Sequence, residues 1–417
     1  MKCSRTMALG ICLLLVLFVE QAPAQMNSSP LTLRQAVAMA RIRNPALIAA
    51  RRNLESTRAE QITAGLRQNP VLAIGGSNVT LPANNPASPY SYSVDLSRLF
   101  ERGQKRRWRL DSARATTEVT ESEYKDLERQ TVLNVEQAFT NMLLAKAALD
   151  LAHKNLYSYR KTVDLSRVRL DAGAISPTDF ERIDLQLAGF ESDYSNAQVN
   201  LIQNADQLQE LLGLGRPSSQ FNIAGTLGPP KLTLSLLTLE QQALAARPDY
   251  LAAQRSIQVA DANVKLADAN GTADPTADAG YDRSGDYNSF GFNVSIPLRI
   301  FDRNQGEKRA FRFTAQASRF SEIAARNKVL SDVDQAWVGY QVAQSLAQRY
   351  NTHYVAEAGH VLNNLEFGYR NGSTTLLDYL NALHDYRQTS LNALSANAQV
   401  WLSIHQLGFA TATEILP

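Results

Sequence analysis

A segment of alternating apolar and polar residues that leads directly into a long helical segment occurs twice in this chain. In the first copy the alternation covers residues 90–96, and the charged segment 100–107 (FERGQKRR) follows it. In the second copy the alternation covers 290–298, and 301–309 (FDRNQGEKR) follows it. A period of two is typical of a strand with one apolar and one polar face. The fold is therefore predicted to be mainly α with membrane β-strands, built from a duplicated unit of strand hairpin and long helix.

Each of these strands has a candidate partner strand just before it in the chain. The first hairpin is expected over 71–100, with its turn at 81–89, and the second over 276–300, with its turn at 282–289. Both turns are polar, and the first is rich in proline and asparagine, as an exposed loop should be.

The helical segments that follow carry a coiled-coil pattern. The first is expected from Glu101 to about Leu170 without a proline, and from Val135 its apolar and small residues recur at alternating spacings of three and four. The same rhythm runs from Leu330 to Leu365. This spacing predicts a helical seam in which small residues allow close approach. Each helix is expected to end at a glycine-containing turn and to be followed by a return helix.

These features predict the following organisation of the chain. We expect a signal peptide at 1–24, a first repeat at 25–215 with a hairpin at 71–100 and coiled-coil helices at 101–212, a linker at 216–236, and a second repeat at 237–417 with a hairpin at 276–300 and coiled-coil helices at 301–408.

The first 24 residues have the composition of a secretion signal. Two basic residues precede an apolar core at 7–19, and Ala22-Pro23-Ala24 precedes the expected cleavage site. An uncleaved anchor is the alternative. Both cysteines, Cys3 and Cys12, lie in this segment, so the mature chain has no disulfide or thiolate metal site. Because no small residue stands directly before Cys12, we expect an unlipidated N-terminus.

Strands are the only candidates for a membrane crossing, because the mature chain has no run of 18 apolar residues. In lipid every strand edge must be paired, and four strands cannot close on themselves. Two copies would supply eight strands and three would supply twelve. The polar face of the predicted strands favours twelve, which leave room for water inside. A soluble sheet with a half-buried face is the alternative.

Several functional classes find no support in the sequence. The formal net charge of +2 creates no field that would attract nucleic acid. There is no phosphate loop, HExxH motif or nucleophile elbow, so we expect no enzyme and no cofactor. His353 and His360 would share a helix face but lack a third ligand at a convincing spacing, so no metal site is predicted.

Six motifs in order resemble the outer membrane efflux protein family, also called the TolC family, over nearly the whole mature chain. They are 31–47 (LTLRQAVAMARIRNPAL), 237–253 (LTLEQQALAARPDYLAA), the junctions 100–107 and 301–309, and the turns 169–180 (RLDAGAISPTDF) and 368–379 (GYRNGSTTLLDY). The first junction, 101–109 (ERGQKRRWR), and Asn69-Pro70 look most like the heavy-metal (cobalt-zinc-cadmium and copper) branch.

This resemblance implies a homotrimer in the outer membrane, with a 12-stranded β-barrel continued by an α-helical barrel in the periplasm. It implies a passive exit duct for metal cations or drugs, which a periplasmic adaptor (membrane fusion) protein joins to an inner-membrane pump of the RND or ABC type. A duct for type I protein secretion shares this fold and stays open as an alternative. A periplasmic coiled-coil scaffold without a pore is the second alternative.

The resemblance also implies two sets of site residues. Asp378 and Asn381 fall where the family narrows the periplasmic entrance. The candidates for docking the adaptor at the helical tip are Arg169, Leu170, Gly173, Asp179, Tyr369, Gly372 and Ser373. For Asp378 a helix-capping role is the alternative, and for the glycines it is a purely structural helix stop.

Overall fold

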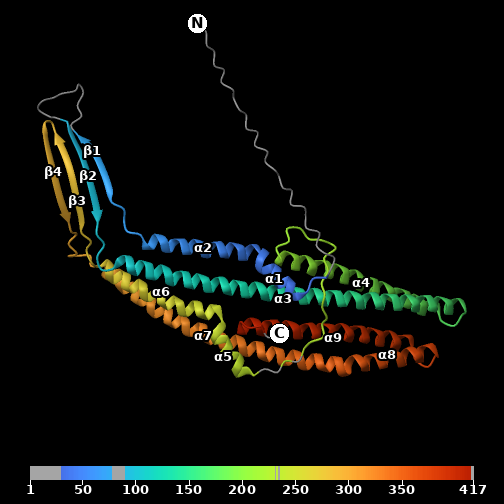
Figure 1. The fold of residues 1–417 in the computed structure, drawn as a ribbon. Helices are drawn as coiled ribbons and strands as arrows, with labels where there is room; N and C mark the ends of the chain where they lie inside the picture. Colours follow the sequence, from blue (N-terminus) through green and yellow to red (C-terminus); the bar gives the residue numbers. More distant parts are fainter. Residues whose placement is uncertain (1–29, 78–89, 231, 233–234, 415–417) are drawn as a thin grey trace, which may run out of the picture.

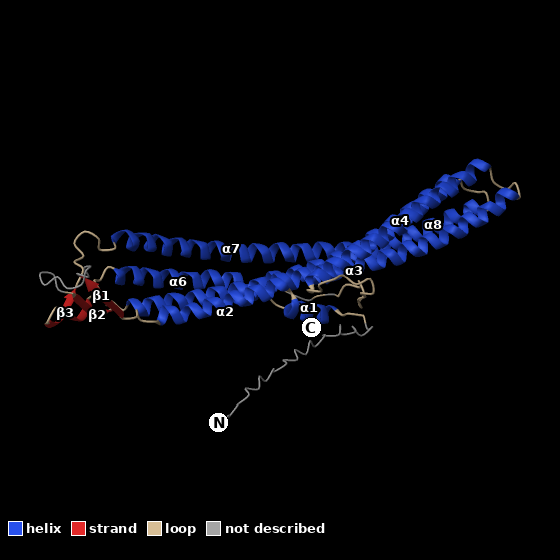
Figure 2. Cartoon of the chain, turned by 90° about the horizontal axis from the view of Figure 1, so that it is seen from above, coloured by secondary structure: helices blue, strands red, loops and turns tan. Residues whose placement is uncertain are grey.

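The computed structural model describes residues 30–77, 90–230, 232 and 235–414. The expected signal peptide, its two cysteines and the first hairpin turn at 81–89 lie outside these residues. Figures 1 and 2 show an elongated body of near-parallel helices with a small sheet at one end. The turns between the long helices lie at the opposite end.

The chain enters this body through two short helices. α1 (Leu33–Arg43) and α2 (Pro45–Gly65) are separated at Asn44, whose side-chain oxygen accepts hydrogen bonds from the backbone N–H groups of the next helix. Thr32 starts α1 with a reciprocal capping box. Pro45 occupies the first position of α2, where its missing N–H is tolerated, so the chain breaks into two helices at this point.

The first long helix, α3 (Lys105–Asp171), has 67 residues and is about 100 Å long. It starts four residues later than predicted. Gly103 and Gln104 have φ angles of +69° and +59°, a left-handed conformation that an α-helix cannot contain. α4 (Pro177–Leu211) returns antiparallel to α3 and completes the first helical hairpin.

The second half repeats this arrangement. α5 (Leu236–Ala246) and α6 (Pro248–Asn270) correspond to α1 and α2. The long helix consists of α7 (Gln305–Arg349), a π-helical turn η1 (Tyr350–Tyr354) and α8 (Val355–Arg370), and α9 (Leu376–Thr411) returns along it. The predicted end of α9 at Leu407-Gly408 is too early, since the left-handed residue that ends the helix is Ala412.

The two halves meet in one antiparallel sheet. Its strands are β1 (Val71–Ser77), β2 (Ser91–Leu99), β3 (Thr276–Ser284) and β4 (Tyr287–Ser295), in the order β1-β2-β3-β4. The central pair, β2 with β3, joins the first hairpin to the second.

The second hairpin differs from its prediction in two details. Its turn has two residues, Gly285-Asp286, instead of spanning 282–289, and Gly285 has the positive φ that such tight turns require. β4 ends at Ser295 instead of continuing to 300. Pro297, which has no N–H for the ladder, explains why the strand stops there.

The predicted seam of α3 is confirmed, whereas that of the second long helix is correct only in part. In α3, eight of the eleven residues that the spacing places on the seam are buried. In the second long helix the pattern holds to Ala347 and then fails, because Tyr354 and Val361 are exposed. The π-helical turn inserts an extra residue, so the buried face shifts by one position, and Leu362 packs into the core instead.

Separate apolar clusters hold the body together along its length. One lies where α1 packs against α3 and α4 and includes Phe139 and Leu208, and the connecting segment adds Ile223. Another lies toward the tip and includes Tyr159, Phe190 and Tyr379 from α3, α4 and α9. Within the described ranges, no helix combines the length and the apolar character needed to cross a membrane.

Candidate functional site

The tip of the molecule is formed by two turns with the same geometry. Each long helix ends in a Schellman motif, with Gly173 (φ +71°) and Gly372 (φ +73°) in the left-handed conformation. In the first turn Ala174 N–H donates to the carbonyl of Arg169, and in the second Ser373 N–H donates to that of Gly368. A Cβ at either left-handed glycine would meet nothing within 4 Å, so these glycines are required by backbone conformation and not by space.

The return helices start with matching caps. Ser176 caps α4 and Thr375 caps α9, and each hydroxyl accepts from the backbone N–H three residues on. The same hydroxyls donate to carboxylates, Ser176 to Asp179 at 2.9 Å and Thr375 to Asp378 at 2.6 Å. The two aspartates therefore occupy equivalent positions, and a capping contact is present at both.

Asp378 is nevertheless exposed, and so is Asn381, which lies one turn further along α9. A spacing of three residues places both on the same helix face. Since one carboxylate oxygen accepts from Thr375, the carboxylate is held in place while its charge stays in contact with solvent.

Some of the candidate docking residues link the two hairpins, and others make contacts only within their own turn. Arg169 lies over the ring of Tyr369 at 5.2 Å, and Tyr369 stacks on Tyr379 at 5.6 Å, so these side chains connect the two hairpins. Burial raises the pKa of Tyr369, and its hydroxyl is buried without a hydrogen-bond partner among the residues described. Leu170 is half-buried beside them, whereas Ser373 points its hydroxyl back to the carbonyl of Gly368.

A second link between the hairpins was not predicted from the sequence. Arg387 of α9 forms an ion pair with Asp193 of α4 and lies 4.2 Å above the ring of Phe190. Arg387 also lines a groove between α3, α4 and α9, with Asn196 and Asn200 on its α4 side. Arg387 and Asp193 are almost 200 residues apart in the chain, so no short sequence motif indicates that they pair.

At the sheet end the two faces differ in chemistry. One face carries apolar side chains in cross-strand rows, such as Leu72, Leu96, Ala279 and Phe292, and Phe292 is 92% exposed. The opposite face carries serines, glycines and three aspartates, Asp95, Asp278 and Asp282. The described strands place no lysine or arginine on that polar face.

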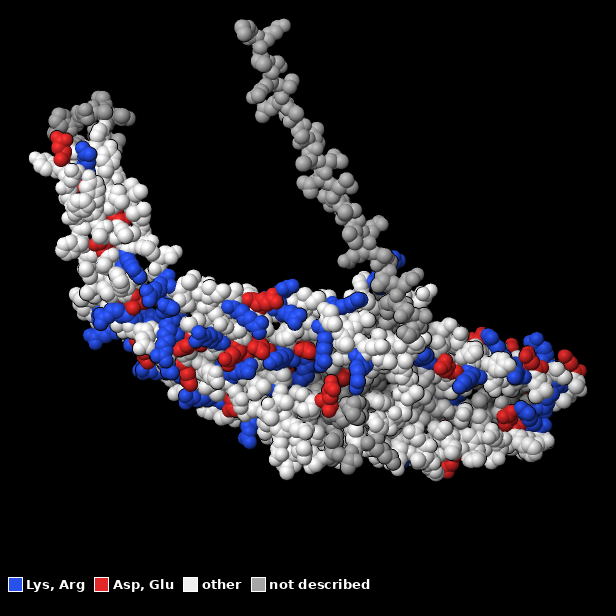
Figure 3. Space-filling view, in the orientation of Figure 1, with Lys and Arg blue, Asp and Glu red and all other residues white. Residues whose placement is uncertain are grey.

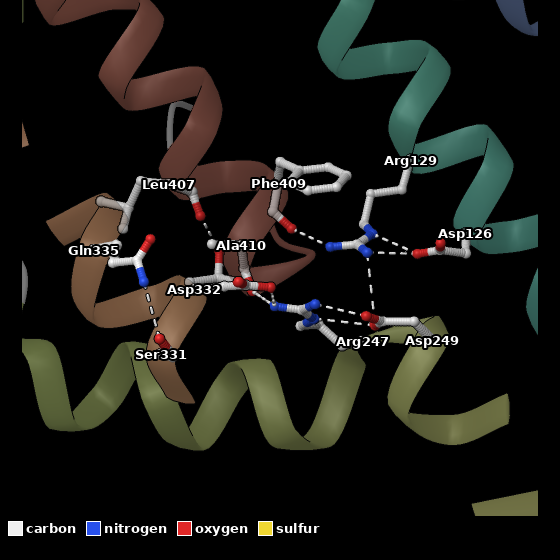
Figure 4. A network of polar contacts seen from close by, with 11 residues as sticks. Asp126, Arg129, Arg247, Asp249, Ser331, Asp332, Gln335, Leu407, Phe409 and Ala410 are labelled. Carbon is white, nitrogen blue, oxygen red and sulfur yellow. Dashed lines mark hydrogen bonds and ion pairs between the residues drawn. The ribbon is translucent and has the colours of Figure 1, made fainter. Parts of the chain in front are cut away.

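Figure 4 shows a buried charge network in the middle of the body that the sequence also failed to reveal. Arg247 is 1% exposed and binds both oxygens of Asp249, at 3.0 and 2.6 Å, and Asp332 of α7 at 2.9 Å. Arg129 of α3 donates to the carbonyl of Phe409 at the end of α9. Burial would raise the pKa of Asp249, but the hydrogen bond and charge of Arg247 outweigh this and lower it.

A second polar pair, of a buried histidine and a half-buried glutamate, lies between α3 and α9. His405 Nδ1 is 3.5 Å from an oxygen of Glu136, and its Nε2 is 3.0 Å from the hydroxyl of Thr140. Burial, with the charge of Glu414 as a smaller cause, raises the pKa of Glu136 to about 7. Burial lowers the pKa of His405 to about 4. Between these values the neutral forms of both groups are favoured.

The described residues include no group of three or more His, Cys, Asp or Glu side chains that could hold a metal ion. His353 instead lies 3.2 Å from Glu357 of its own helix, and both side chains are exposed.

Comparison with known proteins gives a consistent result. The outer membrane efflux protein family matches residues 24–214 and 239–413. The cobalt-zinc-cadmium resistance protein CzcC of Cupriavidus metallidurans is 25% identical over 379 residues, covering 90% of this chain and 88% of CzcC. The outer membrane protein TolC of Vibrio cholerae is 24% identical over 358 residues, covering 81% of this chain and 80% of TolC.

Among solved structures, one of CusC superimposes on this chain with a TM-score of 0.79 at 21% identity, covering 91% of each chain. That structure concerns the folding and transmembrane channel formation of CusC. The likeness extends over both hairpins and the helical body. The family match covers most of the chain and the fold agrees along its length. The chain therefore belongs to the outer membrane efflux protein family, non-enzymatic channel proteins of the outer membrane that extend into the periplasm.

Proposed function

We propose that three copies of this chain form the passive exit duct of a tripartite efflux system. The observation that carries this proposal is a four-stranded sheet with one apolar face on the end of a helical body about 100 Å long. Such a sheet suits a lipid-facing wall, and such a body suits a periplasmic conduit.

The edges of the sheet support assembly. β1 and β4 are the outer strands of the described sheet, and they run in opposite directions because all neighbours are antiparallel. β4 of one copy can therefore pair antiparallel with β1 of the next. Three copies give twelve strands, with the face that carries Asp95, Asp278 and Asp282 turned inward to water.

The proposed substrates are metal cations or drugs delivered by an inner-membrane pump through a periplasmic adaptor. The relative CzcC is named for cobalt, zinc and cadmium resistance, and an inner wall with carboxylates and no basic residue on the described strands favours cations. Energy would come from the pump, since a channel of this kind has no means to supply it.

We place the entrance and the docking surface at the tip. Asp378 and Asn381 would narrow the periplasmic entrance, where three like carboxylates attract cations. The adaptor would contact the docking candidates at the two turns, which are Arg169, Leu170, Gly173, Asp179, Tyr369, Gly372 and Ser373. Opening would separate the hairpins, which requires breaking the contacts of Arg169 with Tyr369 and of Arg387 with Asp193.

The test is purification from the membrane fraction, followed by native mass spectrometry and planar-bilayer recording on the same sample. A conducting trimer is expected. Val94→Asp places a charge on the apolar face and Ile296→Asp places one directly after β4, and both should abolish membrane insertion, whereas Ser93→Asp, on the opposite face of β2, should not. A soluble monomer without conductance would favour a scaffold without a pore, and membrane insertion of both Val94→Asp and Ile296→Asp would contradict a lipid-facing apolar surface.

A further inference from the structure

The place where the sheet meets the helices carries an unusual excess of positive charge. Residues 98–109 contain six basic residues and one acidic residue, and 299–312 contain five basic and two acidic residues. The whole chain has a formal net charge of only +2. Figure 3 shows Lys and Arg gathered at the base of the sheet, above the start of the helical body.

Part of this charge is neutralised within the fold. Lys105 is buried and lies 2.5 Å from Asp274, and Arg109 forms an ion pair with Glu101. The first pair fixes the first turn of α3 against the loop before β3, and the second ties α3 to the segment just before it. The positive charges of Lys105 and Arg109 are therefore neutralised by carboxylates of the same chain.

A second set of arginines has no such role. We call it the basic collar, and it consists of Arg67, Arg98, Arg102, Arg106, Arg303 and Arg309, all of them exposed. Among the residues that the structure describes, none of these side chains has an ion-pair partner, and Arg98 alone stacks on a ring, that of Phe100. Exposed arginines gathered at one level repel each other unless an anion from outside lies between them.

The position of the basic collar identifies the kind of anion. Arg98 follows Val94 and Leu96 on the apolar face of β2, so it is the first charge met where the lipid-facing surface ends. Phe100 and Phe301, which are 45% and 90% exposed, lie at the same junction. Aromatic and basic side chains at the end of an apolar surface are typical of the headgroup level of a membrane.

We propose that the basic collar binds the phosphate groups of anionic phospholipids in the membrane leaflet that faces the periplasm. Guanidinium groups bind phosphate oxygens through two parallel hydrogen bonds, and all six members of the basic collar are arginines. Bound lipids would also fix the depth of the sheet and hold the helices at a defined angle below it. This inference rests on the outer-membrane location and not on the transport role.

The experiment compares lipids with the same acyl chains on purified protein in neutral detergent. Equal amounts of dioleoylphosphatidylglycerol and dioleoylphosphatidylcholine are added, and native mass spectrometry counts the bound molecules of each. The unmodified protein should prefer the anionic lipid. The triple variant Arg106→Gln, Arg303→Gln, Arg309→Gln should lose more than tenfold of this preference, since each arginine near an anionic surface is worth about a fivefold change in affinity.

A matched control removes three arginines elsewhere. Arg51, Arg182 and Arg349 are exposed and, in the described part of the chain, also lack ion-pair partners, so changing them to Gln alters the net charge equally. This variant should keep the preference. A variant with lysine at the three collar positions keeps the charge but not the paired hydrogen bonds, so its preference should lie between those of the unmodified protein and the glutamine variant, which also checks folding. Equal binding of both lipids by the unmodified protein, an unchanged preference in the collar variant, an equal loss in the control, or displacement of the lipid by inorganic phosphate alone would overturn the proposal.

Discussion

Replacing Glu136 with glutamine should stabilise the protein at high pH and leave it nearly unchanged at low pH. Glu136 is half-buried between α3 and α9, with its side chain 25% exposed, and desolvation there raises its pKa from 4.5 to about 7. The folded state therefore holds the proton more tightly than the unfolded state. Stability contributed by the protonated group is complete below pH 4.5 and is lost as the pH rises to about 7.

The size of the effect follows from the pKa. A shift from 4.5 to about 7 corresponds to about 3 kcal/mol at pH 8, where the half-buried carboxylate is ionised. Glutamine does not ionise, so Glu136→Gln should recover this free energy at pH 8 and less than about 1 kcal/mol at pH 5. For a chain of this size the gain at pH 8 corresponds to roughly 3–4 °C in melting temperature.

The assay is thermal unfolding of both proteins in detergent, followed by near-ultraviolet circular dichroism at pH 5, 6, 7 and 8. Glu123→Gln serves as the control, because Glu123 is an exposed residue of the same helix. A melting-temperature difference that does not change with pH, or a variant that is less stable at pH 8, would refute the assignment of a raised pKa to Glu136.

His405 should give the opposite dependence. Its pKa is lowered from 6.5 to about 4, so the folded state binds the proton less tightly than the unfolded state. Stability is lost as the pH falls from 6.5 to 4. His405→Gln should therefore raise the melting temperature most at pH 4–5, the range in which Glu136→Gln has little effect.

Arg247→Met should lower stability by about 1–3 kcal/mol, measured as a fall in melting temperature, because it removes a buried cation that binds two half-buried carboxylates. Gly372→Ala should cost about 1 kcal/mol, since its φ of +73° favours glycine over a residue with a Cβ, whereas Gly339→Ala in the open interior of α7 should stabilise by up to about 1 kcal/mol. Asp378→Ala should raise single-channel conductance and weaken block by multivalent cations in planar bilayers. Asp179→Ala, which removes the equivalent capping contact of the other turn, should leave conductance unchanged.

The features that the sequence predicted well are those encoded locally. The alternation at 90–96 identifies a strand because its side chains alternate between two faces with different surroundings. The seam from Val135 to Leu170 identifies a long helix because one face is repeatedly buried. Gly173 and Gly372 identify helix ends because a left-handed turn favours glycine.

The features that it missed depend on contacts between distant segments. The π-helical turn at Tyr350–Tyr354 keeps its helical composition and changes only the register, so the predicted seam is shifted by one position beyond it. Arg247 belongs to a motif that the sequence marked as a repeat, but its partner Asp332 lies on another helix. The pairing of Arg387 with Asp193 likewise depends on the docking of two hairpins.

The strength of the contacts differs along the helical body, and this difference bears on where the molecule can move. In the middle, Arg247 is almost fully buried and joins α7 to the end of α9 through several charge-assisted hydrogen bonds. At the tip, the link between Arg169 and Tyr369 is a ring contact of half-buried side chains, which costs less to break. The π-helical turn Tyr350–Tyr354 lies between these two regions, where exposed residues leave the helix less constrained. A rearrangement of the tip therefore need not disrupt the network around Arg247, because the contact of Arg169 with Tyr369 lies beyond the irregular turn in the second long helix.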